Sequence, residues 1–182
     1  MQCRGQVNYD RVSFDTASTT SSNIFESLIF PVLQQHLGYT NYYRVESQDN
    51  ATLQILDYRA GIDYLLEQQD GSLISVANRV QTGNNWKTFT LRKSCRSGQA
   101  TEYQKRVRDY NNNSLRPALT IQSYVLPNST GSKILGLGVV GTDHLISTAI
   151  QLNKQRQLMS RSVSDGSFYY IPFDRLTLLL EI

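Results

Sequence analysis

The sequence predicts a single α/β domain over residues 1–182, in which a mixed β-sheet is flanked by helices. Its 182 residues suit one domain, and its 40% apolar content is ordinary for a globular protein. Segments with helical and strand periodicity follow each other in the order helix, strands, helix, strands, helix. No internal repeat and no long linker divides the chain.

A helix is predicted from Asn23 to Leu37, after a polar and flexible approach over residues 1–22. Asn23 with Glu26 three residues later resembles a capping box, and Gly38 suits the helix end. Pro31 predicts a kink or a break inside this helix. Apolar residues recur at the three- and four-residue spacing of a buried helix face; they are Ile24, Phe25, Leu28, Ile29, Val32, Leu33 and Leu37.

Strand patterns occupy residues 42–92. Two short apolar segments, one with Leu53 and Ile55 and one with Ile62, Leu65 and Leu66, lie on either side of the break at residues 60–61. The dipeptide at residues 70–71, Asp-Gly, predicts a hairpin. Residues 72–81 then alternate, and a further strand is expected at 86–92. The alternation places Ile74, Val76 and Val80 on one side, and Ser75, Ala77, Arg79 and Gln81 on the other.

The second half of the chain predicts two helices and four strands. A short charged helix is expected at residues 99–110, followed by a loop at 111–114. Strands at 119–126 and 134–140 enclose a Pro-Asn-Ser-Thr-Gly turn, and a helix capped by Thr142 or Asp143 ends near Leu152. Short strands near 158–163 and 168–171 flank an Asp-Gly turn, and an apolar tail closes the chain.

Positive charge concentrates in the middle of the sequence. The whole chain has a formal net charge of +3 and a pI near 8.9, and most of the excess lies between Lys87 and Arg116. A local basic segment of this kind predicts a footprint for phosphates; a solvated helix face is the alternative. The expected nucleic-acid-binding residues are Lys87, Arg92, Lys93, Arg96, Arg106 and Arg108.

The cysteines and the N-terminus indicate the compartment. Cys3 and Cys95 form neither a disulfide framework nor a metal-ligand pattern. The first residues have no apolar core of a signal peptide, and the apolar stretches are far shorter than a membrane span. We therefore expect a cytoplasmic protein with no membrane partner.

A carboxylate, a hairpin and a polar strand face together predict chemistry near Asp63. Asp63 begins a strand, and the strand after the hairpin carries Ala77, Arg79 and Gln81 on one face. Because adjacent strands lie roughly 5 Å apart, these side chains would share one cleft. Oxygen ligands of this kind suit Mg²⁺ or Mn²⁺. Asp57 is either a second carboxylate of the site or the polar end of a strand.

This arrangement resembles the PD-(D/E)xK nuclease superfamily over roughly residues 23–110. The resemblance is carried by Gly61-Ile62-Asp63, the hairpin, the alternating polar strand, and a helix glutamate that matches Glu26. It implies a restriction-endonuclease-like fold and Mg²⁺- or Mn²⁺-dependent cleavage of nucleic acid, with DNA as the expected partner and a homodimer as one way to cut two strands. The metal ligands it implies are Asp63, Gln81, Glu26 and Asp57.

The chain departs from the family on the second strand. Where the family has Glu-x-Lys, this sequence has Ala77-Asn78-Arg79 or Arg79-Val80-Gln81. The Gln81 amide oxygen would ligate the metal, and Arg79 would hold a phosphate, although its high pKa makes it a poor general base. Glu102 and Lys105, one turn apart on the 99–110 helix, would supply the missing carboxylate and amine; the alternative is an exposed ion pair.

Three functions remain open at this point. The first is a metal-dependent DNA endonuclease of defence, mobile elements or repair, with Asp63, Arg79, Gln81, Glu102 and Lys105 as catalytic residues. The second is a degraded domain of the same fold that binds nucleic acid or a partner protein without cleaving. The third is an unrelated α/β protein in which Asp63 is only a turn residue.

Overall fold

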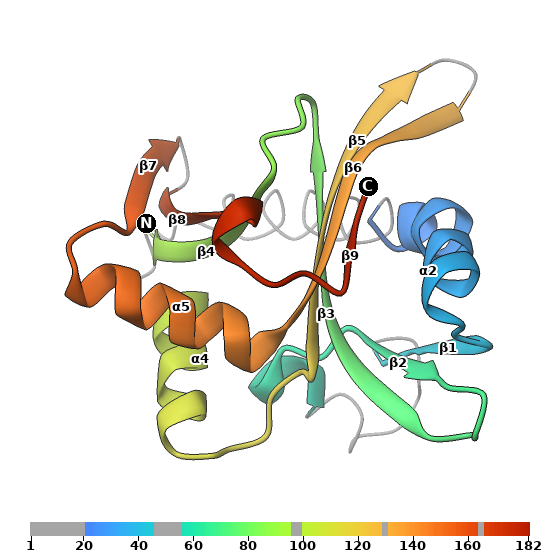
Figure 1. Ribbon diagram of the computed structural model, residues 1–182, viewed down its shortest axis with the longest axis horizontal. Coiled ribbons are helices and arrows are strands. Elements are labelled where there is room, and N and C mark those ends of the chain that lie inside the picture. Colours follow the sequence, from blue (N-terminus) through green and yellow to red (C-terminus); the bar gives the residue numbers. More distant parts are fainter. Residues whose placement is uncertain (1–20, 46–55, 96–99, 129–130, 164–165) are drawn as a thin grey trace, which may run out of the picture.

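The computed structural model describes residues 21–45, 56–95, 100–128, 131–163 and 166–182, which form two β-sheets with helices on both sides (Figure 1). The large sheet contains β1 (Asn41–Arg44), β2 (Tyr64–Glu67), β3 (Leu73–Thr82), β5 (Leu119–Asn128), β6 (Gly131–Gly141) and β9 (Leu180–Glu181), in the order β1-β2-β3-β5-β6-β9. Within it β3 and β5 are parallel and the other neighbours are antiparallel, so the predicted mixed sheet is confirmed.

The small sheet was not predicted as a separate unit. It contains β4 (Thr88–Cys95), β8 (Gly166–Pro172) and β7 (Met159–Val163), in the order β4-β8-β7. Its strands lie close to the predicted segments at 86–92, 158–163 and 168–171, but they pair with each other and not with the large sheet. The predictions that involve residues 1–20, Leu53, Ile55 and Arg96 fall outside the described residues.

The N-terminal helix is continuous over residues 21–37 and changes its hydrogen-bond pattern just before Pro31. A π-helical turn, η1 (Phe25–Ile29), leads into α2 (Phe30–Leu37), whose first turn contains the proline. Gly38 ends α2 in the left-handed conformation, with φ of 74°, and its N–H bonds to the Gln34 carbonyl, as expected of a helix-ending glycine. The capping box expected at Asn23 is wrong, because residues 21–24 are already helical.

The β2–β3 hairpin forms where the Asp-Gly turn predicted it. Gly71 takes the left-handed φ of 81°, and the Asp70 carboxylate accepts the Ser72 N–H at 2.9 Å. Val76 on β3 and Tyr64 on β2 face the first core, where the Phe25 ring stacks on Tyr64 with centroids 3.8 Å apart. Asp63, which precedes Tyr64, and Ala77, which follows Val76, therefore belong to the opposite face of the sheet.

A crossover that contains β4 and α4 (Glu102–Asn111) joins the parallel strands β3 and β5. Helix α4 begins with a capping box: the Thr101 hydroxyl accepts the Gln104 N–H, and the Gln104 side chain accepts the Thr101 N–H. The helix begins at Glu102, later than predicted, since residues 100–101 are not helical. The crossover brings α4 against β4, on the side of the sheet that Asp63 faces.

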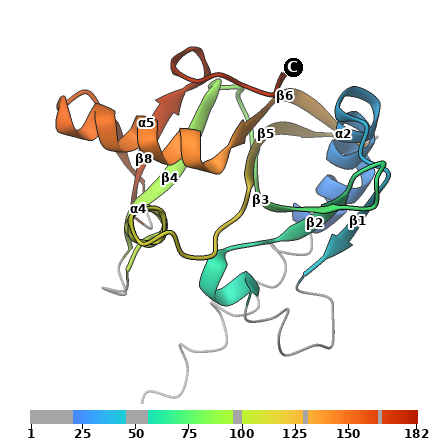
Figure 2. The same ribbon diagram turned by 60° about the horizontal axis from the view of Figure 1, so that its bottom comes forward.

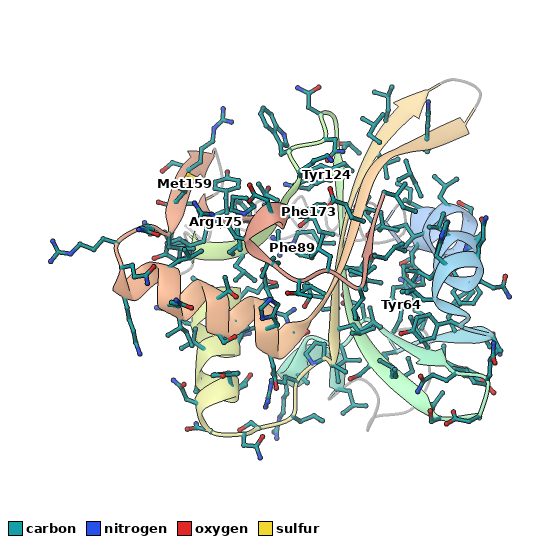
Figure 3. All side chains as sticks on the ribbon, viewed as in Figure 1. Tyr64, Phe89, Tyr124, Met159, Phe173 and Arg175 are labelled. Atoms are coloured by element: carbon teal, nitrogen blue, oxygen red, sulfur yellow. The ribbon has the colours of Figure 1, made fainter. Side chains whose placement is uncertain are left out.

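A second core fills the space between the small sheet, β6 and α5 (Thr142–Lys154). Phe89 and Phe173 pack there with ring centroids 4.9 Å apart, on the side of the large sheet opposite Tyr64 (Figure 3). Helix α5 is capped by Gly141 and not by the predicted Thr142 or Asp143. In the described part of the chain, no helix has both the length and the apolar character needed to cross a membrane.

Candidate functional site

A cavity of about 340 Å³ opens between β3, β5, β4, α4 and the π-helical turn η2 (Leu56–Ala60). These elements surround one region when the molecule is seen from below (Figure 2). We call this cavity the charged pocket. Its lining consists of Arg59, Ala60, Gly61, Asp63, Ala77, Asn78, Arg79, Thr90, Arg92, Glu102, Lys105, Arg106, Asp109, Thr120, Ile121 and Gln122.

Backbone contacts to β3 fix Asp63 at the edge of the pocket. Gly61 turns the chain with φ of 64°, a value that glycine adopts at little cost. The Asp63 N–H then bonds to the Val76 carbonyl at 2.8 Å, and its Oδ2 accepts the Asn78 N–H at 2.6 Å. The carboxylate is thus held beside the strand that carries Arg79.

Glu102 is clamped by two guanidinium groups. Its Oε2 contacts Arg79 Nη2 and accepts the Arg92 N–H at 3.2 Å, while its Oε1 accepts Arg106 Nε at 3.3 Å. Burial acts to raise the pKa of the Glu102 carboxyl, but the charges of Arg79 and Arg106, together with these hydrogen bonds, outweigh it and hold the pKa below its usual value. Glu102 is therefore ionised at neutral pH.

Arg106 is a buried cation with an unused hydrogen-bond donor. The residue is 8% exposed, and its Nη1 has no hydrogen-bond partner among the described residues. A buried polar group without a partner is costly, by about 1–3 kcal/mol and more for a charged group. Because Nη1 has almost no accessible surface, an anion in the charged pocket would supply the missing acceptor once the Arg106 side chain turns toward it. Arg106 is thus the strongest indication that the pocket binds a ligand.

A chain of hydrogen bonds runs from Arg79 through two other residues of the pocket lining to Gln81. Arg79 Nη1 donates to the Thr90 hydroxyl at 3.3 Å, which in turn donates to Gln122 Oε1 at 3.1 Å. Gln122 Nε2 donates to Gln81 Oε1 at 3.1 Å. Gln81 does not line the pocket, and the amide oxygen that was expected to bind a metal is used in this chain.

The structure brings four of the five expected catalytic residues together: Asp63, Arg79, Glu102 and Lys105 all line the pocket. Gln81 lies outside its lining. Glu26, an expected metal ligand, belongs to η1, which packs on the other face of the sheet, and the Asp57 side chain is outside what the structure describes.

The expected nucleic-acid-binding residues are spread over several surfaces. Arg92 and Arg106 line the charged pocket, and Arg108 lines an adjoining hollow with Arg59 and Lys105, where it bonds to Asp109 at 2.9 Å. Lys87 instead pairs with Glu181 at 3.0 Å. Lys93 lies over the Tyr169 ring and donates to the Ser160 hydroxyl.

Several residues of the pocket were missed from the sequence. Thr120 and Gln122 are two residues apart on β5, so both side chains lie on one face of the strand. This face could be assigned to the pocket only once β5 was known to pair with β3. Arg59 stands two residues before Gly61 and carried no separate signal. The burial of Arg106 within a charged helix had no sequence signal at all.

Comparison with known proteins adds no relative: no protein-family model matches the chain, and neither the curated proteins nor the solved structures contain a match. The charged pocket must therefore be interpreted from its own chemistry.

Proposed function

We propose that the chain binds nucleic acid through its phosphodiester backbone in the charged pocket and cleaves it as a metal-dependent endonuclease, with DNA as the substrate. The observation that carries this proposal is the meeting of Asp63, Arg79, Glu102 and Lys105 around the unpaired donor of the buried Arg106. The mixed sheet with helices on both sides supports the restriction-endonuclease-like fold that belongs to the same proposal.

The pocket fits a phosphate through its cations. Arg106 would use its free Nη1, and Arg79 would turn its planar group from Glu102 toward the phosphate oxygens, a geometry that guanidinium groups favour. Lys105, whose ammonium has three donors, would orient the attacking water. These three side chains come from β3 and α4, two elements tied to each other through Glu102.

The pocket contains the kind of oxygen ligand that a hard divalent cation prefers. Asp63 and Glu102 present carboxylate oxygens to one cavity, and Mg²⁺ in proteins usually takes one or two carboxylates plus substrate phosphates. Among the described residues, no three Asp, Glu, His or Cys side chains lie close enough together to hold a metal ion, so phosphate oxygens and water would complete the coordination. When bound, Mg²⁺ or Mn²⁺ would activate water and offset the charge that develops on the phosphate.

A second function, binding without cleavage, is favoured by one specific observation. Both oxygens of Glu102 are engaged by arginines, and Ala77 stands on β3 at the pocket where a further carboxylate would assist a cation. If Arg79 does not release Glu102, Asp63 is the only one of these two proposed metal ligands that remains. The chain would then bind phosphodiesters and leave them intact.

Cleavage of supercoiled plasmid and of circular single-stranded DNA with Mg²⁺ or Mn²⁺ tests the proposal. Asp63→Asn should abolish nicking and keep DNA binding, and Lys105→Gln should abolish nicking and weaken binding by the loss of one phosphate contact. Asp174→Asn, which changes an exposed carboxylate on η3 (Phe173–Arg175), should leave both intact. Salt-sensitive binding that depends on Arg106, with no nicking under any metal, would establish the second function. Absence of both binding and cleavage would refute the two together.

A further inference from the structure

Aromatic side chains of the small sheet lie beside the charged pocket. Strand β8 is the middle strand of this sheet, and side chains alternate along it. Tyr169 and Ile171 belong to the second core, so Phe168 and Tyr170 project from the opposite face. Both of these rings are half-buried.

The register of the three strands places cationic and apolar side chains around the two rings. Arg92 on β4 and Arg161 on β7 flank Phe168, and Thr90 and Met159 flank Tyr170. Arg161 is exposed, and Met159 is 56% exposed. We call this surface the aromatic face, consisting of Thr90, Arg92, Met159, Arg161, Phe168 and Tyr170.

The aromatic face is continuous with the charged pocket. Thr90 and Arg92 belong to both surfaces. The Phe168 ring centroid lies 5.2 Å from the Arg92 guanidinium and 5.6 Å from that of Arg79. The cations that would bind a phosphate thus contact the ring next to it, an arrangement in which a cation–π contact holds the guanidinium group in place.

This continuity matches the chemistry of one nucleotide. A single sugar joins the phosphate to its base, so a phosphate in the pocket brings its base to a neighbouring surface. Unpaired bases stack on aromatic rings and on guanidinium planes, and cationic side chains beside them follow the backbone. In a duplex the same base faces are covered by the neighbouring base pairs.

We propose that the aromatic face stacks on the unpaired base of the nucleotide whose phosphate occupies the charged pocket, so that the chain selects single-stranded DNA over duplex. This inference rests on the proposed function, which supplies the phosphate. The exposed cation Arg161 beside Phe168 favours a nucleotide over an apolar peptide segment, because a nucleotide brings a phosphate and an apolar peptide brings no counter-charge.

The test measures binding in EDTA, where a metal-dependent enzyme does not cleave. Fluorescence anisotropy is recorded with three labelled probes of equal length: a single strand, a duplex, and an abasic strand that keeps every phosphate. The native chain should bind the single strand about tenfold more tightly than the abasic strand, as expected for one well-stacked base, and more tightly than the duplex.

The variant that tests the aromatic face is Phe168→Leu with Tyr170→Leu, which keeps apolar volume and charge and removes the ring surfaces. It should lower single-strand affinity about tenfold and leave the abasic strand unchanged. Tyr43→Leu is the matched control, since this 40% exposed ring lies on β1, at an edge of the large sheet.

The outcomes separate this inference from the function on which it rests. Equal affinity of the native chain for the three probes would overturn base stacking and leave phosphodiester binding intact. An equal loss for all three probes in the double variant would show that the rings only support the arginines, and would also overturn it. No binding of any probe by the native chain would refute the proposed function itself.

Discussion

The carboxylate of Glu102 is the partner of two guanidinium groups, so its replacement by Gln tests the electrostatics of the charged pocket directly. Glutamine keeps the shape of the side chain and one acceptor oxygen, and it removes the negative charge between Arg79 and Arg106. We expect two effects of opposite sign: a lower free energy of unfolding and a higher affinity for anions.

The loss of stability follows from the burial of the three side chains. Removing one partner of a buried ion pair costs roughly 3–5 kcal/mol, whereas exposed pairs contribute about 1 kcal/mol or less. The side chain of Arg106 is 10% exposed, that of Glu102 22% and that of Arg79 29%, so the site lies between these cases. We expect about 2 kcal/mol, or a shift of roughly 1 M in the urea midpoint.

The same substitution predicts a pH dependence. Because the pKa of Glu102 is lowered in the folded state from the ordinary value of 4.5, its contribution is present in full above that pH. The contribution is lost as the pH falls through the lowered pKa. Urea titrations of the native chain and of Glu102→Gln should therefore differ at pH 7 and converge in acid.

Binding of an abasic strand should strengthen about fivefold in Glu102→Gln, the effect of roughly 1 kcal/mol from one unmasked charge. The matched control is Glu181→Gln, which breaks the exposed pair with Lys87 and should change neither quantity appreciably. If stability and affinity fall together, the carboxylate merely holds α4 in place, and the reasoning is refuted. An unchanged free energy of unfolding would refute the stability that we assign to the contacts of Glu102 with Arg79 and Arg106.

Three further substitutions test the packing, the helix cap and a surface ion pair. Gly138→Ala should destabilise the fold by about 1–3 kcal/mol in urea unfolding, because an added Cβ would lie 2.5 Å from Phe173 Cζ; a neutral result would mean that the ring moves freely. Thr101→Ala should cost about 1 kcal/mol through the lost capping box of α4, and Thr101→Ser should restore most of it. Hydrogen bonding to Arg116 lowers the pKa of Asp143, so the stabilising pair is present above pH 3.8 and lost in acid. Since Asp143 is 59% exposed, Asp143→Asn should cost less than about 1 kcal/mol at pH 7 and nothing in acid or high salt.

Local patterns account for the parts of the fold that the sequence predicted. The Asp70-Gly71 turn and the alternation of Val76 and Val80 define a hairpin within twenty residues, so its register needs no distant information. The charged segment at 99–110 and the segment from residue 142 to about 152 likewise located α4 and α5 to within a few residues, although the predicted cap of α5 was wrong. Their boundaries shifted because the cap geometry, and not the composition, decides the first helical residue.

The small sheet was not predictable because its pairing is non-local. Strand β4 pairs with β8, whose residues lie more than seventy positions later, for example Phe89 with Ile171. Nothing in either segment specifies this partner over a strand of the large sheet. The choice follows from the second core, where Phe173 packs against Phe89 and occupies the space that Gly138 leaves open.

The candidate site likewise has one part that local patterns predict and another part that depends on contacts between distant segments. Asp63 and Arg79 were placed together by the hairpin register, and Glu102 with Lys105 by the spacing of one helical turn. That these two pairs meet depends on the crossover from β3 to β5, which no local pattern encodes. The role of Arg106 depends on this meeting, since its burial and its unpaired Nη1 exist only when α4 lies against the sheet.

The salt dependence of binding would show how many cations of the pocket are available to a phosphate. Among the described residues, its lining carries five cationic side chains and three carboxylates, a formal surplus of two positive charges. If the carboxylates neutralise their partners, the logarithm of the association constant for a single strand should fall with the logarithm of salt concentration with a slope of about −1.4. A slope near −3.5 would mean that all five cations contact phosphates. Asp63 and Glu102 would then no longer be paired with cations, and their oxygens could bind a divalent metal. Lys105→Gln should reduce the slope by about 0.7, and an unchanged slope would exclude Lys105 from contact with the backbone.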